Sequence, residues 1–485
     1  MSDKVTLEKV TNLCKRRGFI FQSSEIYGGI NGFWDFGPYG VTMRRAIEGL
    51  WWNYMVESRD NVVGQDSTII SHPRVWDASG HTEQFADHMV DNKITKKRYR
   101  LDNLLDQQTA EVIAKLAENF TIEGEADGEK LEILLTDKEC TNAAELMVAA
   151  GVIDADNKKV GDWTEPRQFN LMMQTYVGPV FDEDHKAFLR AETCQPIFVN
   201  FNQIQTASRQ KLPFGIAQTG KAFRNEINPR NFIFRSREFT QMEMEFFCHD
   251  EESMDWYNYW REERINFYKN ERKLDDGMSR IHEHEKLAHY AKAARDVELK
   301  FPFGWGELEG VHHRGTWDIS RHAEFSKAKM NYFDQERNEH YAPTVVETSV
   351  GLDRMMLAIL CHAYDEDVAS TQKEGKAEDI RTVLRFPAKI APVQVAILPL
   401  SKKLAESAGE VYSKVRQNFR AEYDHTGAIG KRYRRFDEIG TPYCVTVDFD
   451  TAEDGCVTVR ERDEMTQERV KLEDLQSYLF GKING

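Results

Sequence analysis

The sequence predicts an α+β protein with two parts: a domain over residues 1–390 built on an antiparallel β-sheet flanked by helices, and an α/β domain over residues 391–485. Two observations support this prediction. Between residues 181 and 247, strand-like segments alternate apolar residues with Arg and Glu, which is typical of a sheet with one charged face. After the text PAKIAP at 387–392, a strand-like VQVAILPL, a helical segment and a strand-like PYCVTVDF follow in βαβ order.

The elements of the first part follow from their periodicity. Residues 38–60 have apolar side chains at helical spacing, so they predict one long amphipathic helix that Pro38 starts. The text NVVGQDSTIISHP, which ends at Pro73, predicts a strand because β-branched residues alternate in it. Residues from about 93 to 163 are polar and rich in Ala and Glu, and we expect an inserted helical subdomain there. A second insertion, charged and helical in period, is expected at about 250–300.

Composition excludes several classes of protein. With 41% hydrophobic and 30% charged residues, the 485-residue chain is of the folded globular type. Its longest apolar runs fall far short of the ~20 residues of a membrane span, and its first ten residues have no signal or transit pattern, so we expect a cytoplasmic protein without membrane contact. Seven scattered cysteines, never spaced CxxC, argue against a disulfide scaffold and a zinc ribbon. Because the net charge is −16, any contact with nucleic acid would depend on local basic patches.

Three segments look like known motifs but lack an essential feature. GIAQTGKA at 215–222 is close to a phosphate loop, but Ala222 stands where a Mg²⁺-binding hydroxyl is required. HEHEKLAH at 282–289 contains no HExxH, and a solvated helix face accounts for it. His312 and His313 are adjacent in a predicted strand, so they should point to opposite faces and not share a metal.

The segment FRNEINPRNFIFRSREFTQMEME at 223–245 has the pattern of a nucleotide site. Phe and Ile alternate with Arg and Glu, so the charges are expected on one face of a hairpin, where Arg can fork onto phosphate oxygens and Glu can hold Mg²⁺. A hairpin with surface ion pairs is the alternative. Downstream, ETSVGLDRMMLAIL at 347–360 places Gly351 and Arg354 at the start of an apolar helix, which is either a capped core helix or a second nucleotide contact.

At these residues the chain resembles the class II aminoacyl-tRNA synthetases, and within them the homodimeric glycyl-tRNA synthetases. FRNE with RSREF is similar to the second motif of the class and VGLDR to the third. The long helix, the strand and Pro73 are similar to the first motif, which builds the dimer interface in that family. Text typical of the glycyl group stands at 34–40 (WDFGPYG), 73–81 (PRVWDASGH), 98–102 (RYRLD), 164–172 (TEPRQFNLM) and 432–442 (RYRRFDEIGTP).

The resemblance implies a class II catalytic domain with helical insertions, an anticodon-binding domain, and a set of site residues. The ATP-binding residues would be Arg224, Asn225, Glu226, Phe234, Arg235, Phe239, Glu307, Leu308, Gly351, Leu352, Asp353 and Arg354. The glycine-binding residues would be Arg100, Glu192, Phe239, Thr240, Gln241, Met242, Glu243, Glu347 and Ser349. The expected catalytic residues are Arg224, Glu226 and Arg354, with Mg²⁺ bound alongside ATP near Glu226 and Glu307.

The same resemblance implies contact with tRNA(Gly) through the carboxyl-terminal domain. The expected RNA-binding residues are Lys431, Arg432, Arg434 and Arg435. Tyr433 and Phe436 interleave with these charges and could add stacking to phosphate neutralisation. A solvated basic surface is the alternative.

As a function, the resemblance implies a glycine–tRNA ligase, which makes glycyl-adenylate and pyrophosphate from glycine and ATP and then transfers glycine to the 3′ end of tRNA(Gly) for protein synthesis. A methyl group contributes only about 1–3 kcal/mol to binding, so glycine would have to be selected by excluding alanine. Two alternatives stay open: a class II relative that activates alanine, serine or proline, and an inactive paralogue that only binds RNA.

The chain departs from the family pattern near the expected glycine pocket. Where the family commonly reads LRPETAQG, this chain reads LRAETCQP, with Ala191, Cys194 and Pro196 around Glu192, and Thr348 stands in place of a proline. The charged residues are kept, so we expect altered loop geometry. Cys140 is the one cysteine near the position where many relatives carry a pair, so no zinc site is expected there.

Overall fold

The protein was analysed as a computed structural model, which describes residues 5–117, 142–272, 278–283, 291–368 and 380–484. The chain forms two compact units, one of Met1–Ser71 with Leu189–Gly485 and one of His72–Phe188. The insertion expected at 93–163 falls inside the second unit. Among the described residues, no helix combines the length and the apolar character needed to cross a membrane.

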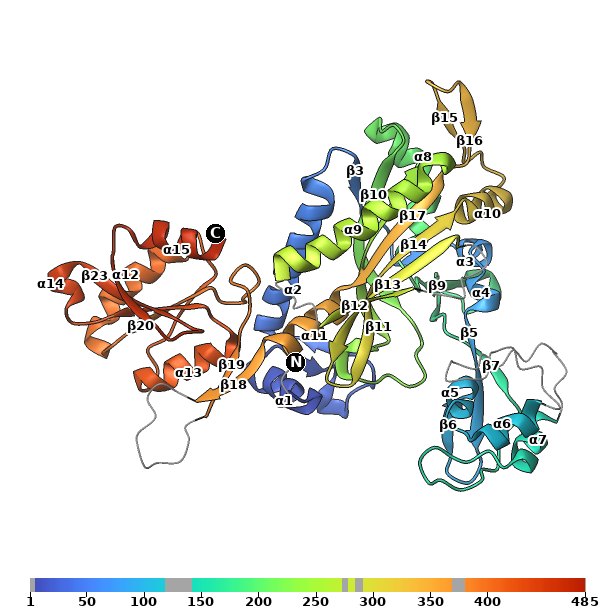
Figure 1. Ribbon diagram of the computed structural model, residues 1–485, viewed down its shortest axis with the longest axis horizontal. Coiled ribbons are helices and arrows are strands. Elements are labelled where there is room, and N and C mark those ends of the chain that lie inside the picture. Colours follow the sequence, from blue (N-terminus) through green and yellow to red (C-terminus); the bar gives the residue numbers. More distant parts are fainter. Residues whose placement is uncertain (1–4, 118–141, 273–277, 284–290, 369–379, 485) are drawn as a thin grey trace. The chain divides into compact units, whose positions relative to one another are not determined.

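The first unit is built on a seven-stranded sheet with the strand order β12-β13-β14-β17-β11-β10-β3 (Figure 1). Its strands are β3 (Val62–Gln65), β10 (Phe214–Phe223), β11 (Glu238–Cys248), β12 (Ser279–Glu283), β13 (Ala293–Phe301), β14 (Gly304–Gly315) and β17 (Thr344–Gly351). Every neighbouring pair is antiparallel except β3 with β10, which is parallel. The predicted α+β fold on an antiparallel sheet is therefore confirmed.

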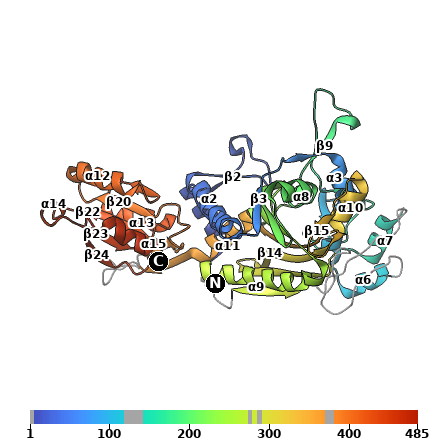
Figure 2. The same cartoon turned by 90° about the horizontal axis from the view of Figure 1, so that it is seen from above.

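One face of this sheet carries the main hydrophobic core. Met242, Met244 and Phe246 of β11 are fully buried there with Val346 and Val350 of β17. Helices α2 (Pro38–Trp52), α9 (Ser253–Arg272) and α11 (Leu352–Ala363) contribute many further residues to this core. Figure 2 shows α9 running along the sheet.

The opposite face is covered only in part. Phe198 and Phe201 of α8 (Gln195–Ser208) pack on Phe214 and Phe247 of the sheet, and Ile319 of α10 (Trp317–Ser326) joins the same cluster. Because β11 alternates, Phe247 lies on the same face as Glu245 and Glu243, two and four residues back along the strand. The helices thus cover the end of this face at Phe247, and the charged residues occupy the end at Glu243.

The predicted elements before the sheet are present with changed bounds. The helix from Pro38 has its proline in the first turn and continues after Trp52 as a π-helical turn, Asn53–Glu57. The single strand predicted up to Pro73 is divided into β3 and β4 (Ile70–Ser71), and Pro73 begins α3 (Pro73–Ala78). The backbone N–H at the first helical position has no partner within the helix, so a proline there costs no hydrogen bond, which explains why Pro38 and Pro73 each begin a helix.

The described residues of the segment expected as a second insertion, at about 250–300, form a helix that packs on the central sheet and two strands of that sheet. Helix α9 is followed by β12 and β13, and β13 pairs with β14 along its whole length. The charges in RDVELKF obscured a strand in which Val297, Leu299 and Phe301 alternate inward. Within the segment HEHEKLAH, His282 and Glu283 end β12, whereas residues 284–290 lie outside the described residues.

The second unit, His72–Phe188, mixes helices with strands. A three-stranded antiparallel sheet has the order β6-β5-β7, with β5 (Ala86–Asn92), β6 (Lys97–Arg100) and β7 (Arg167–Asn170). Helices α5 (Leu101–Leu105), α6 (Ala110–Ala117) and α7 (Ala143–Ala150) share a core with Val90 and Trp163. The unit also contains α4 (His81–Gln84), β8 (Gln174–Tyr176) and β9 (Lys186–Leu189). The expected helical subdomain therefore includes short strands, whose four to seven residues carry too many charges to show alternation.

The carboxyl-terminal part of the first unit is the predicted α/β domain. Its five-stranded sheet has the order β21-β20-β22-β23-β24, in which β20 is parallel to both neighbours. The strands are β20 (Val395–Pro399), β21 (Ala421–Tyr423), β22 (Tyr443–Val447), β23 (Cys456–Glu461) and β24 (Gln467–Lys471), and the helices are α12 (Ala405–Val415), α13 (Ile429–Ile439), α14 (Thr451–Asp454) and α15 (Leu475–Asn484). The domain has its own core of Val, Leu, Ile, Tyr, Ala and Phe side chains.

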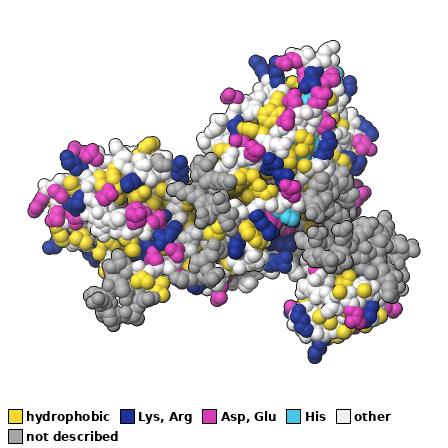
Figure 3. All heavy atoms as spheres, in the orientation of Figure 1, with side chains coloured by type: hydrophobic (Ala, Val, Ile, Leu, Met, Phe, Trp, Pro, Cys, Tyr) yellow, Lys and Arg dark blue, Asp and Glu magenta, His cyan; other side chains and the backbone are white. Residues whose placement is uncertain are grey.

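Shorter elements complete the first unit. Helix α1 (Leu7–Arg17) is followed by a pair of strands, β1 (Ile20–Gln22) and β2 (Trp34–Phe36). Two more antiparallel pairs are β15 (Tyr332–Asp334) with β16 (Glu339–Tyr341), and β18 (Tyr364–Val368) with β19 (Ile380–Leu384). Acidic and basic side chains are interspersed over the face of the molecule shown in Figure 3.

Candidate active site

A cavity of about 230 Å³ lies on the partly covered face of the central sheet. The residues predicted for ATP or glycine that line it are Glu192, Arg224, Glu226, Phe234, Arg235, Phe239, Gln241, Glu243, Glu307, Glu347, Ser349, Gly351, Asp353 and Arg354. They come from β11, β14, β17, the start of α11 and two connecting segments. Segments more than 100 residues apart in sequence are thus brought to one site by strand pairing, because β17 lies between β11 and β14.

One side of the cavity is rich in arginine. Arg224 Nε donates to the carbonyl oxygen of Ala191 at 3.1 Å, and its guanidinium lies 5.3 Å from the Phe239 ring centroid. Arg235 Nε donates to Glu226 Oε2 at 2.8 Å. These side chains give the cavity the donors that a polyphosphate requires.

Arg354 is held at the start of α11. Its guanidinium lies 4.6 Å from the Phe234 ring centroid, and Nε donates to the Phe234 carbonyl oxygen at 3.2 Å. Its Nη1 is 3.3 Å from Glu307 Oε2. A β-bulge on β14 opposite Val297 and Glu298 lets Glu307 line the cavity while Leu308 is buried in the core.

Asp353 connects three elements around the site. Its Oδ2 accepts from the Thr240 backbone N–H at 2.7 Å, and its Oδ1 pairs with Arg44 of α2. Gly351 immediately precedes α11 and also lines the cavity. The start of this helix therefore packs in the core and also faces the cavity, and its contact with a nucleotide stays a prediction.

The other side of the cavity is acidic. Glu243 of β11 is 2% exposed, and its carboxylate accepts from the Thr193 N–H at 3.0 Å, from the Thr193 hydroxyl, from Gln241 Nε2 at 2.8 Å and from Ser349 Oγ at 2.7 Å. Burial, together with the charges of Glu347 and Glu192, raises the pKa of Glu243 to about 7. This carboxyl group therefore titrates near neutral pH.

Glu347 of β17 has the opposite electrostatic situation. Burial raises its pKa, but Arg314 and His312 outweigh burial and hold the pKa of Glu347 below its ordinary value. Arg314 Nη1 donates to Glu347 Oε2 at 2.7 Å, and His312 Nδ1 lies 2.8 Å from Glu347 Oε1. Arg314 is itself fixed by two hydrogen bonds to Asp318, at 2.8 and 3.0 Å.

Glu192 is held by Cys194, which departs from the family pattern, and by Gln195, which matches it. The Cys194 thiol and Gln195 Nε2 each donate to Glu192 Oε1 at 3.0 Å. Pro196 occupies the first turn of α8, where a missing N–H is tolerated. Thr348 is 1% exposed and, by the alternation of β17, faces away from the cavity.

Sequence reasoning missed several residues of the cavity. Ile233, Ser236, Gly310, His312 and Arg314 also line it. The alternation in GVHHRG could have placed His312 on the charged face, and the structure does separate the two histidines: His312 lines the cavity, whereas His313 Nε2 lies 2.9 Å from Ser253 Oγ. No sequence signal could have paired Arg314 with Glu347, since that contact depends on strand register.

Glu245 is a further residue that was not predicted. It lies opposite Glu347 in the β11–β17 register, is fully buried, and has no hydrogen-bond partner on either carboxyl oxygen among the described residues. Burial and the neighbouring Glu347 raise its pKa well above the ordinary value. Glu245 is therefore a buried acid beneath the acidic side of the cavity whose surroundings favour the protonated form.

Some predicted residues do not line the cavity. Thr240 and Met242 alternate with Gln241 and Glu243 on β11 and point to the helix-covered face, where Met242 is fully buried and Arg44 donates to the Thr240 hydroxyl. Asn225, Leu308 and Leu352 are also absent from the lining. Arg100 is the last residue of β6 in the second unit, and its assignment to glycine stays a prediction.

Two carboxylates are suited to Mg²⁺. Glu226 and Glu307 line the arginine-rich side and offer the oxygen ligands that Mg²⁺ prefers, although each already faces an arginine. Within the described residues, Cys194, Glu245 and Glu347 form a second group, with potential ligand atoms within 4.8 Å of one another. Burial holds the pKa of the Cys194 thiol well above its ordinary value, which disfavours the thiolate form that would bind a metal.

The predicted RNA-binding residues lie on α13 in different environments. Lys431 is exposed. Arg432 is only 3% exposed, and its guanidinium donates to the carbonyl oxygens of Pro399 and Asp424 inside the domain. Arg434 donates to the Ile380 carbonyl oxygen, and Arg435 pairs with Asp424.

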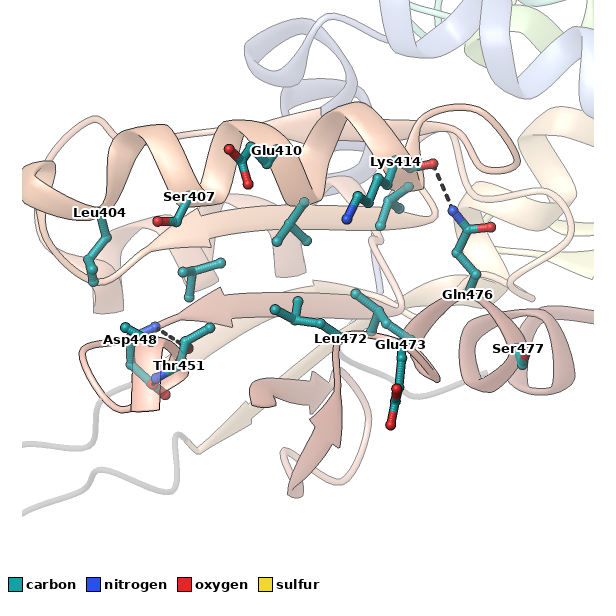
Figure 4. A pocket seen from close by; sticks show the side chains of 15 residues that line it. Leu404, Ser407, Glu410, Lys414, Asp448, Thr451, Leu472, Glu473, Gln476 and Ser477 are labelled. Atoms are coloured by element: carbon teal, nitrogen blue, oxygen red, sulfur yellow. Dashed lines mark hydrogen bonds between the residues drawn. The ribbon is translucent and has the colours of Figure 1, made fainter. Parts of the chain in front are cut away.

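A larger cavity, of about 540 Å³, lies in the carboxyl-terminal domain between α12 and the segment from Leu472 to Ser477 (Figure 4). Its lining includes one cation, Lys414, and no arginine. The cavity on the central sheet is lined by four arginines and six acidic side chains, so it is the better candidate for the active site.

Comparisons with known proteins agree with this architecture. Residues 179–363 match the "tRNA synthetase class II core domain (G, H, P, S and T)" family, and residues 394–481 match the "Anticodon binding domain" family. The fold and site thus define a class II aminoacyl-tRNA synthetase.

Relatives that match the chain over its full length identify the family within this class. The chain is 46% identical to the glycine–tRNA ligase of Clostridium acetobutylicum over 492 aligned positions, covering 100% of both chains. It is 45% identical to the corresponding enzymes of Clostridium perfringens, with 99% of both chains covered, and of Treponema denticola, with 99% of this chain and 98% of the relative covered. The chain belongs to the glycine–tRNA ligase family.

Proposed function

We propose that the chain activates glycine with ATP and transfers it to the 3′ end of tRNA(Gly), as the names of its relatives imply for them. The single observation that carries the proposal is the division of one cavity into an arginine-rich side and an acidic side. The arginines would bind the triphosphate and the acidic side the ammonium of an amino acid, which places its carboxylate between them.

In the first step, a carboxylate oxygen of glycine attacks the α-phosphorus of ATP. The bond from the α-phosphorus to the bridging oxygen breaks, and pyrophosphate leaves with that oxygen. Arg224 would neutralise charge on the α-phosphate, and Arg354 would hold the far end of the triphosphate. Glu226 and Glu307 would hold Mg²⁺, which supplies further neutralisation when bound.

Selection of glycine would rest on the exclusion of alanine and larger amino acids from the cavity. Glu243, Glu347 and Ser349 line the acidic side, with the Ser349 hydroxyl donating to Glu243 at 2.7 Å. Filling that space with a methyl group would displace these hydrogen-bonded groups. The carboxyl-terminal domain would bind the tRNA, with the exposed Lys431 as one phosphate contact.

We further propose that the protein acts as a dimer in the cytoplasm. Ile26, Tyr27 and Ile30 are 88%, 87% and 55% exposed, next to the β1–β2 pair and close in sequence to α2. A cluster of exposed large apolar residues is typical of an interface. Light scattering of the purified protein tests the proposed dimer, and a monomer at micromolar concentration would refute it.

The central test is amino-acid-dependent ATP–pyrophosphate exchange without tRNA. We expect exchange with glycine and at most traces with alanine, serine or proline. Faster exchange with any of those three would point to another class II specificity. Absence of exchange with every amino acid, in a protein that still binds tRNA, would indicate the RNA-binding paralogue.

A further inference from the structure

His312 is a cavity residue whose position is set by the strand beneath it. It lies on β14 opposite Glu347 of β17, and Gly310, two residues earlier, faces the same side. A Cβ at residue 310 would come within 2.6 Å of His312 Cε1 and 2.8 Å of Nε2. The imidazole therefore lies over Gly310, in a space that any other residue would fill.

The ring bridges two carboxylates on neighbouring strands. Nδ1 lies 2.8 Å from Glu347 Oε1, and Nε2 lies 3.7 Å from Asp296 Oδ1 on β13. Burial lowers the pKa of His312, but its contacts with Asp296 and Glu347 outweigh burial and raise the pKa to about 10. With both nitrogens facing acids, the imidazolium form satisfies both contacts.

Glu347 is consequently held between two cations, one at each carboxylate oxygen. Arg314 donates to Oε2 at 2.7 Å, while His312 lies at Oε1. Glu243 and Glu245 differ from it: among the described residues, Glu245 has no hydrogen-bond partner on its carboxyl oxygens, and the hydrogen bonds to Glu243 come from neutral donors. Of these three acids, Glu347 is thus the one whose contacts favour the ionised form.

We propose that His312 is a positioning residue, which as an imidazolium fixes the orientation and the charge of Glu347 so that this carboxylate can receive the ammonium group of the substrate. This inference deepens the proposed function and rests on it. His312 would act through Glu347 and not on the reacting atoms. The charged groups that face His312 and Glu347 are Asp296 of β13, Arg314 of β14, Glu243 and Glu245 of β11, and Glu192 before α8.

The test separates the geometry of the contact from its charge. His312→Ala removes both, whereas His312→Asn keeps a donor at the position of Nδ1 without the positive charge. His340→Ala, an exposed histidine of β16, is the matched control. KM for glycine, KM for ATP and kcat are measured by pyrophosphate exchange between pH 6 and pH 9, and circular dichroism compares the folding of each variant.

We expect His312→Ala to raise KM for glycine about tenfold or more, because a hydrogen bond to a charged group is lost, and to leave KM for ATP within about twofold. Loss of the cation raises the pKa of Glu347, so protonated Glu347 becomes more abundant as the pH falls. The ratio of variant to wild-type KM for glycine should therefore increase from pH 9 to pH 6. His312→Asn should recover part of the affinity at pH 9 but keep the increase at low pH.

Two outcomes would overturn the inference while leaving the proposed function in place. One is a KM for glycine within twofold of wild type in His312→Ala. The other is an equal rise in both KM values with no pH dependence, which would indicate a purely structural role. If wild-type protein shows no exchange with glycine, the proposed function fails first and this inference fails with it.

Discussion

Replacement of Glu243 by glutamine should make the protein more stable at alkaline pH. Glutamine keeps the shape of Glu243. Among the described residues, Gln241 Oε1 has no hydrogen-bond partner, so once the Gln241 amide turns, this oxygen can accept from the amide of the introduced glutamine. The change removes the ionisable group from a position that is 2% exposed. Glu243 lies in the cavity, so the same change should also raise KM for glycine.

The magnitude follows from the pKa. Glu243 titrates at about 7 in the folded protein against an ordinary value of 4.5, so the folded state binds this proton more tightly than the unfolded state. The resulting stabilisation is fully present below pH 4.5 and is lost as the pH rises through 7. At about 1.4 kcal/mol per pKa unit, up to about 3 kcal/mol is lost. With glutamine at this position, the free energy of unfolding has no such loss over this pH range.

Thermal melting at pH 5, 6.5 and 8 measures the difference. The Tm of Glu243→Gln minus that of wild type should increase with pH, by about 3 °C between pH 5 and pH 8. Glu262→Gln, at an exposed position of α9, is the control and should show no such trend. A Tm difference that is the same at all three pH values would refute the argument, because Glu243 would then ionise as it does in the unfolded chain.

Three other predictions concern separate parts of the chain. Arg224→Ala should reduce pyrophosphate exchange at least about 100-fold, as loss of a donor to developing charge does elsewhere, with tRNA affinity nearly unchanged in a filter-binding assay. Arg264→Met should lower Tm by several degrees, because Glu309, which is 0% exposed like Arg264, would lose its ion-pair partner, at a cost of about 3–5 kcal/mol of stability. Adding Glu309→Leu should restore much of the lost stability. A double variant that is no more stable than Arg264→Met would contradict this prediction. Lys431→Ala should reduce the salt dependence of tRNA binding by about one released counterion. Arg432→Ala should mainly lower the Tm of the carboxyl-terminal domain, because Arg432 forms hydrogen bonds inside that domain. If instead Arg432→Ala changes the salt dependence and Lys431→Ala changes the Tm, the RNA surface lies elsewhere.

The sequence alone determined the features that depend on local pattern. Alternation of apolar and charged residues identified β11 and its charged face, and proline at a helix start identified α2. The arginines and acids of these segments, such as Arg224, Glu226 and Arg354, were predicted and do line one cavity. Such patterns are readable because they repeat within one strand or one helical turn.

Strand register decided the rest of the site. Met242 was predicted to contact glycine, yet it alternates to the helix-covered face, while the bulge on β14 lets Glu307 line the cavity and leaves Leu308 in the core. Arg432 was predicted from a basic cluster, but a helix directs neighbouring side chains to different sides, and this one enters the domain.

The electrostatic state of the acidic side depended on tertiary contacts entirely. Glu243, Glu245 and Glu347 are the same residue type in similar sequence surroundings. Arg314 and His312 contact the carboxylate of Glu347 directly, because β14 pairs with β17 and not with β11. The sequence therefore determined which side chains the site contains, whereas the pairing of strands decided which carboxyl group is ionised, since pKa values depend on burial and on charges a few ångströms away.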